Sequence, residues 1–380
     1  MANMLNYIKW RGDLSFDEAP FCEVDSLILS QICYVDFEGI VSPSLNETIT
    51  LSEATKGYLR RHAGEKAYLG AIIPKEIILL MSKAACSKRF SKIELCGHVN
   101  LVLDDLEMQF SATTFILKKN MLFVAFRGTD DTLVGWKENF NMSFMHPVPA
   151  QTESVSYLES VMASRKEKNV IVGGHSKGGN LAVYALTKAS KKTKARVKEA
   201  YNHDGPGFSR EFIESPDYDE VRSRIRTILP QTAVVGMLLE HEERYDVIKS
   251  NQTGLFQHDS FSWEVLGPNF IHLDTVTKES KFIDKTIKKW LSTMPAEERE
   301  RFVENLYTSL SVQGAKTLTD LSTNKAKIIK VWSGLDAGTR EAALKYIKLL
   351  FRETAKGVLK KKSSADKKKT PAKKSPRAKT

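Results

Sequence analysis

The hydrophobic pattern of the first 270 residues alternates between short apolar runs and helical stripes. Met121–Phe126 and Val170–Val172 are continuous apolar runs of the kind found in central strands. After the second run, apolar residues recur at helical spacing between positions 181 and 186. Further strands are expected at Asp105–Leu117, Val197–Asn202, Ile225–Leu229 and Tyr245–Ser250, and helices at Glu23–Tyr34, Leu51–Arg61 and Pro74–Ala85. Strands that alternate with helices predict an α/β fold with a predominantly parallel central sheet.

Beyond residue 275 the pattern becomes helical. Helices are expected at Ser280–Leu291, Pro295–Leu310, Asn324–Trp332 and Thr339–Leu359. Phe302, Leu306 and Leu310 share one helical face, which predicts that these helices pack on one another as a C-terminal appendage. Alternatively, the last helix binds a membrane surface or a partner, because basic residues lie beside its apolar ones. We divide the chain into an N-terminal helical segment that packs on the core (1–92), a core (93–275), the appendage (276–359) and a tail (360–380).

The net charge of +11 is concentrated at the C-terminus. Residues 356–380 contain eleven Lys or Arg and one acidic residue, a net charge of +10 that leaves +1 for the rest of the chain. Because the tail lacks apolar periodicity, we expect it to be disordered. It either solubilises the protein or makes weak, nonspecific contacts with a polyanion such as nucleic acid or an anionic membrane surface.

The sequence favours a cytoplasmic location. No run approaches the roughly 18 apolar residues of a membrane span, and the N-terminus lacks the apolar core of a signal peptide. Attachment to a membrane or nucleic acid through the tail would make the protein peripheral. The four cysteines show no metal-binding spacing and are expected to be buried free thiols. No metal or organic cofactor is expected.

Gly174–Gly178 reads Gly-His-Ser-Lys-Gly and matches the G-x-S-x-G pattern between a strand and a helix. In a nucleophile elbow the serine occupies a strained turn, so the positions two before and two after it must be small. Ser176 is therefore the candidate nucleophile. The alternative is an ordinary glycine-rich turn with a bystander serine. His175 is expected to pack or hydrogen-bond beneath the turn rather than react.

Two backbone amides are candidates to bind an oxyanion. Thr129 follows the strand Met121–Phe126, where a hydrolase sheet needs one donor, and Lys177 follows the nucleophile. Alternatively, Thr129 or Asp130 only caps the following helix. The Lys177 side chain either favours anionic substrates or points to solvent.

These motifs carry a family resemblance. Phe126-Arg-Gly-Thr129, Trp136-Lys-Glu-Asn-Phe140 and the Ser176 turn resemble the arrangement of the class 3 (fungal-type) triacylglycerol lipases, members of the α/β-hydrolase superfamily, over about Val99–Val265. The N-terminal sequence, Ser176-Lys-Gly-Gly-Asn180 and Asp204-Gly-Pro-Gly-Phe208 are more similar to an uncharacterised bacterial family of unknown function placed beside those lipases. The resemblance implies an α/β-hydrolase fold with a nucleophile elbow and a lipase or esterase activity, without naming a substrate.

A catalytic base and acid are expected after the nucleophile in the chain. His258 follows the predicted strand Tyr245–Ser250, and a histidine on such a loop reaches the serine in this superfamily. Class 3 lipases place an aspartate after the strand that here is Ile225–Leu229, but Pro230–Ala233 contains no carboxylate. Asp204 is the preferred acid, although it could instead satisfy the amides of the turn after it. Glu240, Asp246 or no acid at all are the other options.

Two functions from different classes follow. The first is a serine hydrolase that cleaves a lipid or small acyl ester through Ser176, His258 and Asp204, with the Thr129 and Lys177 amides as oxyanion donors. The second is a catalytically silent hydrolase-fold scaffold, which its basic tail tethers to a polyanion or membrane surface. Neither function fixes the acyl chain or the oligomeric state.

Overall fold

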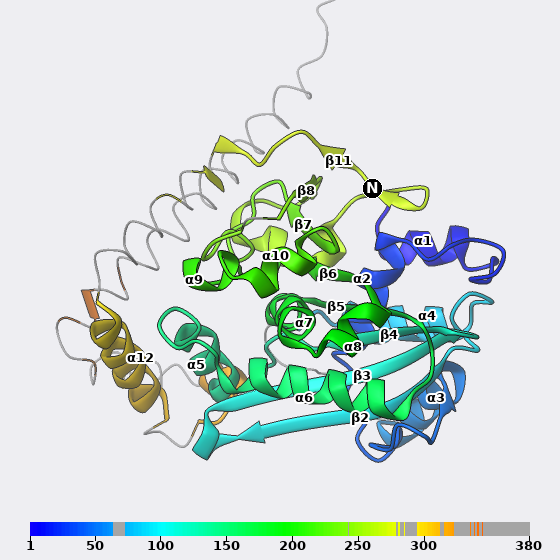
Figure 1. The fold of residues 1–380 in the computed structure, drawn as a ribbon, viewed down its shortest axis with the longest axis horizontal. Helices are drawn as coiled ribbons and strands as arrows, with labels where there is room; N and C mark the ends of the chain where they lie inside the picture. The colour runs from blue at the N-terminus through cyan, green and yellow to red at the C-terminus, as the bar shows by residue number, and fades with distance from the viewer. Residues whose placement is uncertain are drawn as a thin grey trace, which may run out of the picture.

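A nine-stranded mixed sheet runs through the centre of the protein (Figure 1). The structure is a computed structural model that describes residues 1–63, 73–241, 243–278, 280–281, 285, 295–311, 315–322, 335, 338, 340–341 and 344. The strands are β1 (Ile49–Thr50), β2 (Glu94–Leu103), β3 (Met108–Lys118), β4 (Met121–Phe126), β5 (Asn169–His175), β6 (Val197–His203), β7 (Ile225–Pro230), β8 (Tyr245–Ile248) and β11 (His272–Leu273). A separate small hairpin pairs β9 (Val265–Leu266) with β10 (Asn269–Phe270).

The strand order decides where the helices lie. The order is β1-β2-β3-β4-β5-β6-β7-β8-β11, with antiparallel pairing at both ends and parallel pairing from β4 to β8. Each parallel strand is therefore placed beside the one before it, always in the same direction. Crossovers between parallel strands are right-handed, so all helices that connect β4 to β7 lie on the same face of the sheet. The fold is mixed α/β, as the alternating pattern predicts.

The crossover helices cover one face of the sheet. They are α5 (Leu133–Asn141), α6 (Pro149–Ser164), α7 (Lys177–Lys188), α8 (Lys191–Arg196), α9 (Arg210–Ile213) and α10 (Pro216–Arg222). Leu122 and Val124 of β4 share a buried cluster with Leu158 of α6 and Leu181 of α7. Helix α7 packs directly on β5 and β6.

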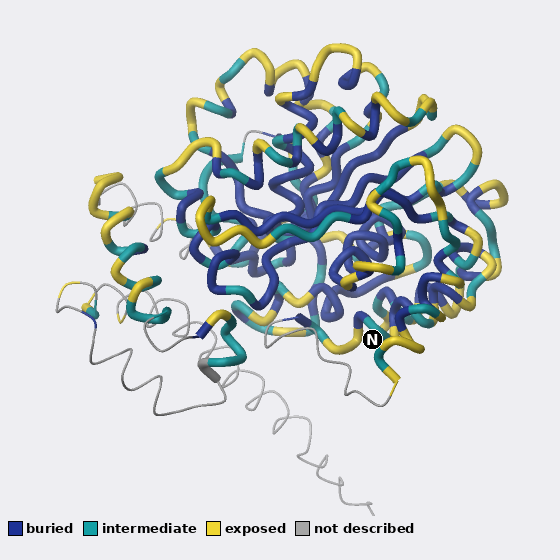
Figure 2. Tube along the Cα trace, turned by 90° about the horizontal axis from the view of Figure 1, so that it is seen from below, coloured by how far each residue is buried: buried dark blue, intermediate teal, exposed yellow. Residues whose placement is uncertain are grey.

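The opposite face is covered by the N-terminal helices. These are α1 (Met4–Arg11), α2 (Glu23–Ile32), α3 (Leu51–Arg61) and α4 (Glu76–Ala85). Phe123 and Ala125 of β4 alternate with the residues that face the crossover helices, and they join the cluster that includes Leu27 and Ile28 of α2. Every residue of α2 after Glu23 is buried, so this helix is an integral layer of the fold. Figure 2 shows the strands as a buried centre with exposed residues on the outer turns.

Most predicted elements are present. The boundaries of β4 and α3 are those predicted, while α2, α4, β6, β7 and β8 differ from the prediction by a few residues. The sequence pattern gave no ranges for α1, β1, β2, α6 and α8 to α10. It also did not predict the late strands β9 to β11, so β8 is not the last strand of the sheet. The cysteines are free thiols, but only Cys33 and Cys96 are buried.

The C-terminal helix predicted from Pro295 is α12 (Ala296–Ser311), which lies beside α5 at the left of Figure 1. A short helix, α13 (Leu318–Ser322), follows it and was not predicted. The predicted helices 324–332 and nearly all of 280–291 and 339–359, together with the tail 360–380, lie outside the described residues. Within the part of the chain that the structure describes, no helix is long and apolar enough to cross a bilayer.

A buried ion pair ties the N-terminal layer together. Arg89 donates two hydrogen bonds to the Asp25 carboxylate, at 2.8 Å from Nε and 2.6 Å from Nη2, and neither side chain is exposed. The same guanidinium donates to the carbonyl oxygens of Ala19 and Pro20. Tyr7 of α1 donates to the same carboxylate. The conformation of the loop before α2 therefore depends on the Arg89 guanidinium, which follows α4 in the chain.

We predict that Arg89→Met destabilises the protein by about 3–5 kcal/mol, because it leaves the Asp25 carboxylate buried without its cation. Urea unfolding monitored by circular dichroism would measure the loss. Lys88→Met is the matched control, since its ion pair with Glu18 is exposed and should matter little. Equal effects of the two substitutions would contradict the assignment of the buried pair as a main stabilising contact of this layer.

Candidate active site

Ser176 occupies a strained turn between β5 and α7. Its φ of 58° and ψ of −133° lie outside the regions that non-glycine residues favour, which costs on the order of 1–3 kcal/mol. The Ser176 amide donates to the His203 carbonyl oxygen at 2.9 Å, and its own carbonyl accepts from Gly179 at 2.9 Å. These bonds fix the turn to β6 on one side and to α7 on the other. The side chain is partly exposed.

Both glycines of the motif are sterically required. A Cβ on Gly178 would lie 2.0 Å from the Phe126 carbonyl oxygen, and one on Gly174 would lie 2.3 Å from the Gly178 carbonyl carbon. No side chain can be accommodated at such distances without moving the backbone. The glycines therefore allow the end of β4, the end of β5 and the start of α7 to meet.

The same contacts place the segment carrying Thr129 against the turn. A Cβ on Gly128 would lie 2.6 Å from the His175 carbonyl oxygen and 2.0 Å from the Tyr34 hydroxyl. Thr129 itself is buried, and its Oγ1 accepts a hydrogen bond from Asn139 Nδ2. The residues with the two candidate oxyanion amides, Thr129 and Lys177, thus lie on adjoining segments.

Neither Thr129 nor Asp130 caps the following helix, which corrects the alternative drawn from the sequence. Thr132 is the N-cap of α5, because its Oγ1 accepts from the Gly135 amide at 3.1 Å. Asp130 instead binds Arg127 Nη2 at 2.9 Å and accepts from the Thr132 amide. The cap lies three residues beyond Thr129, which leaves the Thr129 amide free of a capping role.

Asp204 and His258 are hydrogen-bonded to each other. His258 Nδ1 lies 2.6 Å from Asp204 Oδ2, and the other carboxylate oxygen accepts from the Gly236 amide at 3.1 Å. Asp204 is fully buried, whereas a quarter of the His258 side chain is exposed. Burial raises the pKa of the Asp204 carboxyl, and the bond to His258 opposes this rise. Asp204 thus lies at His258 Nδ1, the position expected of the acid.

The alternative role for Asp204, satisfying the turn after it, is wrong. The Gly205 amide donates to Asn202 Oδ1 at 2.9 Å, so the asparagine two residues earlier satisfies that turn. The loop after β7, whose first residues Gln231–Ala233 carry no carboxylate, contributes in another way. Its Gly236 amide binds Asp204, and its Thr232 amide donates to Gln257 Oε1 at 2.8 Å, next to His258.

His175 links the serine turn to the His258 loop. Its Nε2 lies 3.0 Å from the His258 carbonyl oxygen, and the two imidazole centroids are 4.7 Å apart. A carbonyl oxygen only accepts, so Nε2 carries the proton and Nδ1 accepts from the Tyr34 hydroxyl at 3.3 Å. Burial lowers the pKa of His175 well below its usual value, and the ring is therefore neutral. This agrees with the expected hydrogen-bonding role beneath the turn, although nothing in the sequence indicated Tyr34.

The Lys177 side chain neither points to solvent nor faces a substrate, which corrects both expectations for it. Its Nζ donates to Glu138 Oε2 at 2.7 Å and to the Gln109 carbonyl oxygen at 2.6 Å, and neither charged side chain is exposed. Glu138 also accepts from the amides of Gln109 and Ala150. Lys177 therefore anchors the first turn of α7 to α5, β3 and α6.

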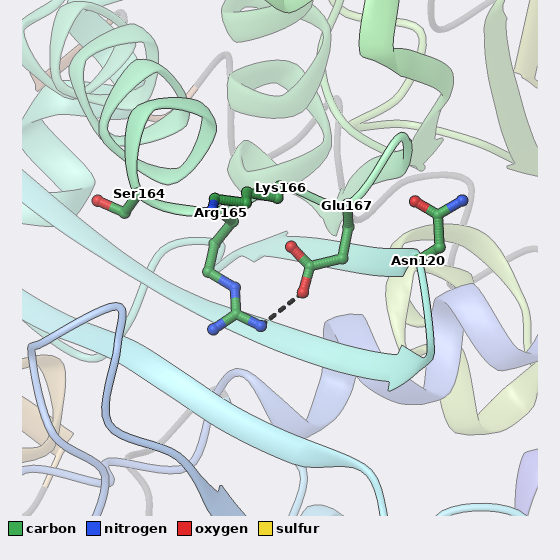
Figure 3. A pocket seen from close by; sticks show the side chains of 5 residues that line it. All are labelled: Asn120, Ser164, Arg165, Lys166 and Glu167. Carbon is green, nitrogen blue, oxygen red and sulfur yellow. Dashed lines mark hydrogen bonds and ion pairs between the residues drawn. The ribbon is translucent and has the colours of Figure 1, made fainter.

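A pocket of about 370 Å³ lies at the other end of β5. Asn120, Ser164, Arg165, Lys166 and Glu167 line it, and Arg165 Nη2 pairs with Glu167 Oε1 at 2.5 Å (Figure 3). These residues precede β5 in the chain or end the β3–β4 turn, whereas Ser176 follows β5. The pocket is therefore separate from the Ser176 turn. Among the described residues, no group of three or more His, Cys, Asp or Glu side chains could hold a metal ion.

Comparison of the sequence with models of protein families shows which family the chain belongs to. The model of the Mbeg1-like family matches residues 84–308, which is more than half of the chain. The chain belongs to the Mbeg1-like family. This is a lipase-like family, and its match includes Ser176, Asp204 and His258. No curated protein matches the sequence significantly.

We predict that Glu138→Gln destabilises the protein by about 3–5 kcal/mol, since it leaves the Lys177 ammonium buried without a negative partner. Adding Lys177→Met to this variant should recover part of the loss, because the uncompensated charge disappears. Urea unfolding of the two single variants and the double variant would measure this coupling. Strictly additive losses from the two single substitutions would contradict this coupling. Glu304→Gln, which removes a half-exposed partner of Lys137, is the control.

His203 should make stability depend on pH. It is fully buried, and its Nε2 lies 2.9 Å from Ser26 Oγ. Burial lowers the pKa of His203 to about 3. Below the unfolded-state pKa of about 6.5, the unfolded chain binds a proton that the folded protein does not, so stability falls as the pH falls.

Between pH 7 and pH 5 this residue should lower the free energy of unfolding by about 2 kcal/mol. We predict that His203→Gln, which cannot titrate, removes about that much of the pH dependence. Urea unfolding at both pH values would measure the difference. The same pH dependence in both proteins would show that His203 takes up a proton in the folded protein over the same pH range as in the unfolded chain.

Proposed function

We propose that the protein is a serine hydrolase of the α/β-hydrolase type that cleaves an acyl ester. The observation that carries this proposal is the 2.6 Å bond between His258 and buried Asp204, on a loop that His175 links to the strained Ser176 turn. A histidine whose Nδ1–H donates to a carboxylate presents Nε2 as the atom that can accept a proton. The membership in a lipase-like family supports an ester as the substrate class.

In the proposed acylation step, Ser176 Oγ attacks the ester carbonyl carbon while His258 Nε2 takes the hydroxyl proton. The carbonyl oxygen becomes an oxyanion, which accepts hydrogen bonds from the Thr129 and Lys177 amides. Asp204 orients His258 and stabilises the imidazolium. The intermediate then collapses, the C–O bond to the alcohol breaks, and His258 returns the proton to the alcohol.

Deacylation repeats these roles with water. His258 takes a proton from a water molecule, the resulting hydroxide attacks the acyl-serine, and the oxyanion forms again at the same amides. The intermediate then collapses, the bond between the acyl carbon and Ser176 Oγ breaks, and His258 returns its proton to Oγ, which releases the carboxylic acid and restores the hydroxyl. No group outside the chain is required. The fungal-type lipases, and the bacterial family beside them, are the proposed relatives, and the proposed substrate is a lipid or small acyl ester in the cytoplasm.

The activated serine is tested with a fluorophosphonate probe and p-nitrophenyl butyrate. Ser176→Ala should abolish labelling and turnover, and His258→Ala and Asp204→Asn should each lower kcat about 10³- to 10⁴-fold, because the base or its orientation is lost. Asp246→Asn and Glu240→Gln are the matched controls and should keep the wild-type kcat.

A loss of activity in Asp246→Asn as large as that in Asp204→Asn would contradict the assignment of the acid. A folded wild-type protein that neither reacts with the probe nor hydrolyses esters would favour the tethered scaffold instead. Deleting residues 360–380 is an independent test of the two functions, since a scaffold should lose its polyanion while an active enzyme should keep its turnover.

A further inference from the structure

A C-terminal segment pairs with the loop that follows Thr129. We call residues 315–322 the strap; it lies next to α12 in the chain and ends in α13. The Leu133 amide donates to the Lys316 carbonyl oxygen at 2.9 Å, and the Leu318 amide donates to the Asp131 carbonyl oxygen at 2.9 Å. These reciprocal bonds flank an antiparallel bridge between Thr132 and Thr317. The strap is thus paired with the loop as an added strand would be.

Side chains reinforce the pairing. The Asp131 carboxylate accepts from the Thr319 amide at 3.2 Å and from the Thr319 hydroxyl. Asp320 accepts from the amides of Lys316 and Thr317, both at 2.9 Å, which shapes the turn of the strap itself. Carboxylates that accept from amides and hydroxyls form the stronger class of hydrogen bond, so these contacts fix the strap in one register.

Apolar contacts anchor the strap to α12 and α5. Leu133 and Ala315 are both buried against each other, with three partly buried side chains around them: Tyr307, Leu310 and Leu318. Helix α12 is itself attached to α5, because Lys137 pairs with Glu304 and lies over the Tyr307 ring. The loop is therefore paired with the strap, which packs against α12.

The loop has two fixed ends, and Thr129 lies between them. On one side, Phe126 and Gly128 are packed against the Ser176 turn. On the other side, Asp131 and Leu133 bind the strap. An oxyanion donor is effective because it is oriented before the reaction begins, so the rigidity of this loop bears directly on catalysis.

We propose that the strap positions the loop that carries the Thr129 amide, and that Asp131 and Thr319 are the positioning residues. The inference rests on the proposed function, because it assigns a role to the Thr129 amide. The strap lies beyond residue 308, where the Mbeg1-like match ends. The geometry of the proposed site thus depends on a part of this chain that the family model does not include.

The test uses Thr319→Val in the full-length protein. We expect kcat for p-nitrophenyl butyrate to fall roughly three- to tenfold, because the transition state loses a well-oriented donor while substrate binding does not. KM should stay within twofold, and Thr319→Ser, which restores the hydroxyl, should recover the wild-type kcat. Thr308→Val is the matched control, since Thr308 is exposed on α12. Hydrogen exchange should become faster at the amides of residues 128–133 in Thr319→Val, and it should stay at the wild-type rate in Thr308→Val.

Asp131→Ala gives a second route to the same contact, because it removes the carboxylate that accepts from both the amide and the hydroxyl of Thr319. Combined with Thr319→Val it should lower kcat no further than Asp131→Ala alone, because the hydroxyl has then already lost its acceptor. Wild-type kcat in both single variants would overturn the role of the strap and leave the proposed function standing. An inert wild-type protein would overturn the proposed function and the role of the strap together.

Discussion

The unidirectional order of the parallel strands is the constraint on which the rest of the structure depends. Because β4, β5 and β6 are parallel neighbours, their carboxyl ends lie at one edge of the sheet, and each end continues into a loop of the candidate site. Thr129 follows β4, Ser176 follows β5 and Asp204 follows β6. The same order leaves one face of the sheet without crossover helices. The N-terminal helices must cover that face, so they are part of the fold and not an addition to it.

The site also depends on how closely these strand ends approach. Gly174 and Gly178 permit contacts with the Phe126 carbonyl oxygen and with each other that any side chain would prevent. The strain of the Ser176 backbone is maintained because its amide binds β6 and its carbonyl binds α7. Conformations of this kind persist only where the surrounding structure over-determines them, and strained residues of this type gather at functional sites.

Local patterns were sufficient to predict the elements that flank Ser176 and the motif itself. The apolar run of β4, the strand before Ser176 and the helix after it follow from hydrophobic periodicity alone. The choice of Asp204 was left open because the alternatives differ only in three-dimensional contacts. His258 reaches Asp204 across 54 positions of sequence, and the Gly236 amide reaches it from the loop after β7. Tyr34 and the strap were not predicted for the same reason, since each contacts a segment more than 90 residues away.

The error about Lys177 has a physical explanation that bears on how the site is built. A lysine after the nucleophile suggests an exposed cation, because a lone ammonium is costly to bury. Glu138 removes that cost, since it supplies a negative charge and also accepts two backbone amides. With its side chain directed beneath the helix, Lys177 leaves only its backbone amide to serve as the proposed donor. The buried ion pair therefore supports the position of that amide, and the Lys177 charge is not exposed to a ligand at the Ser176 turn.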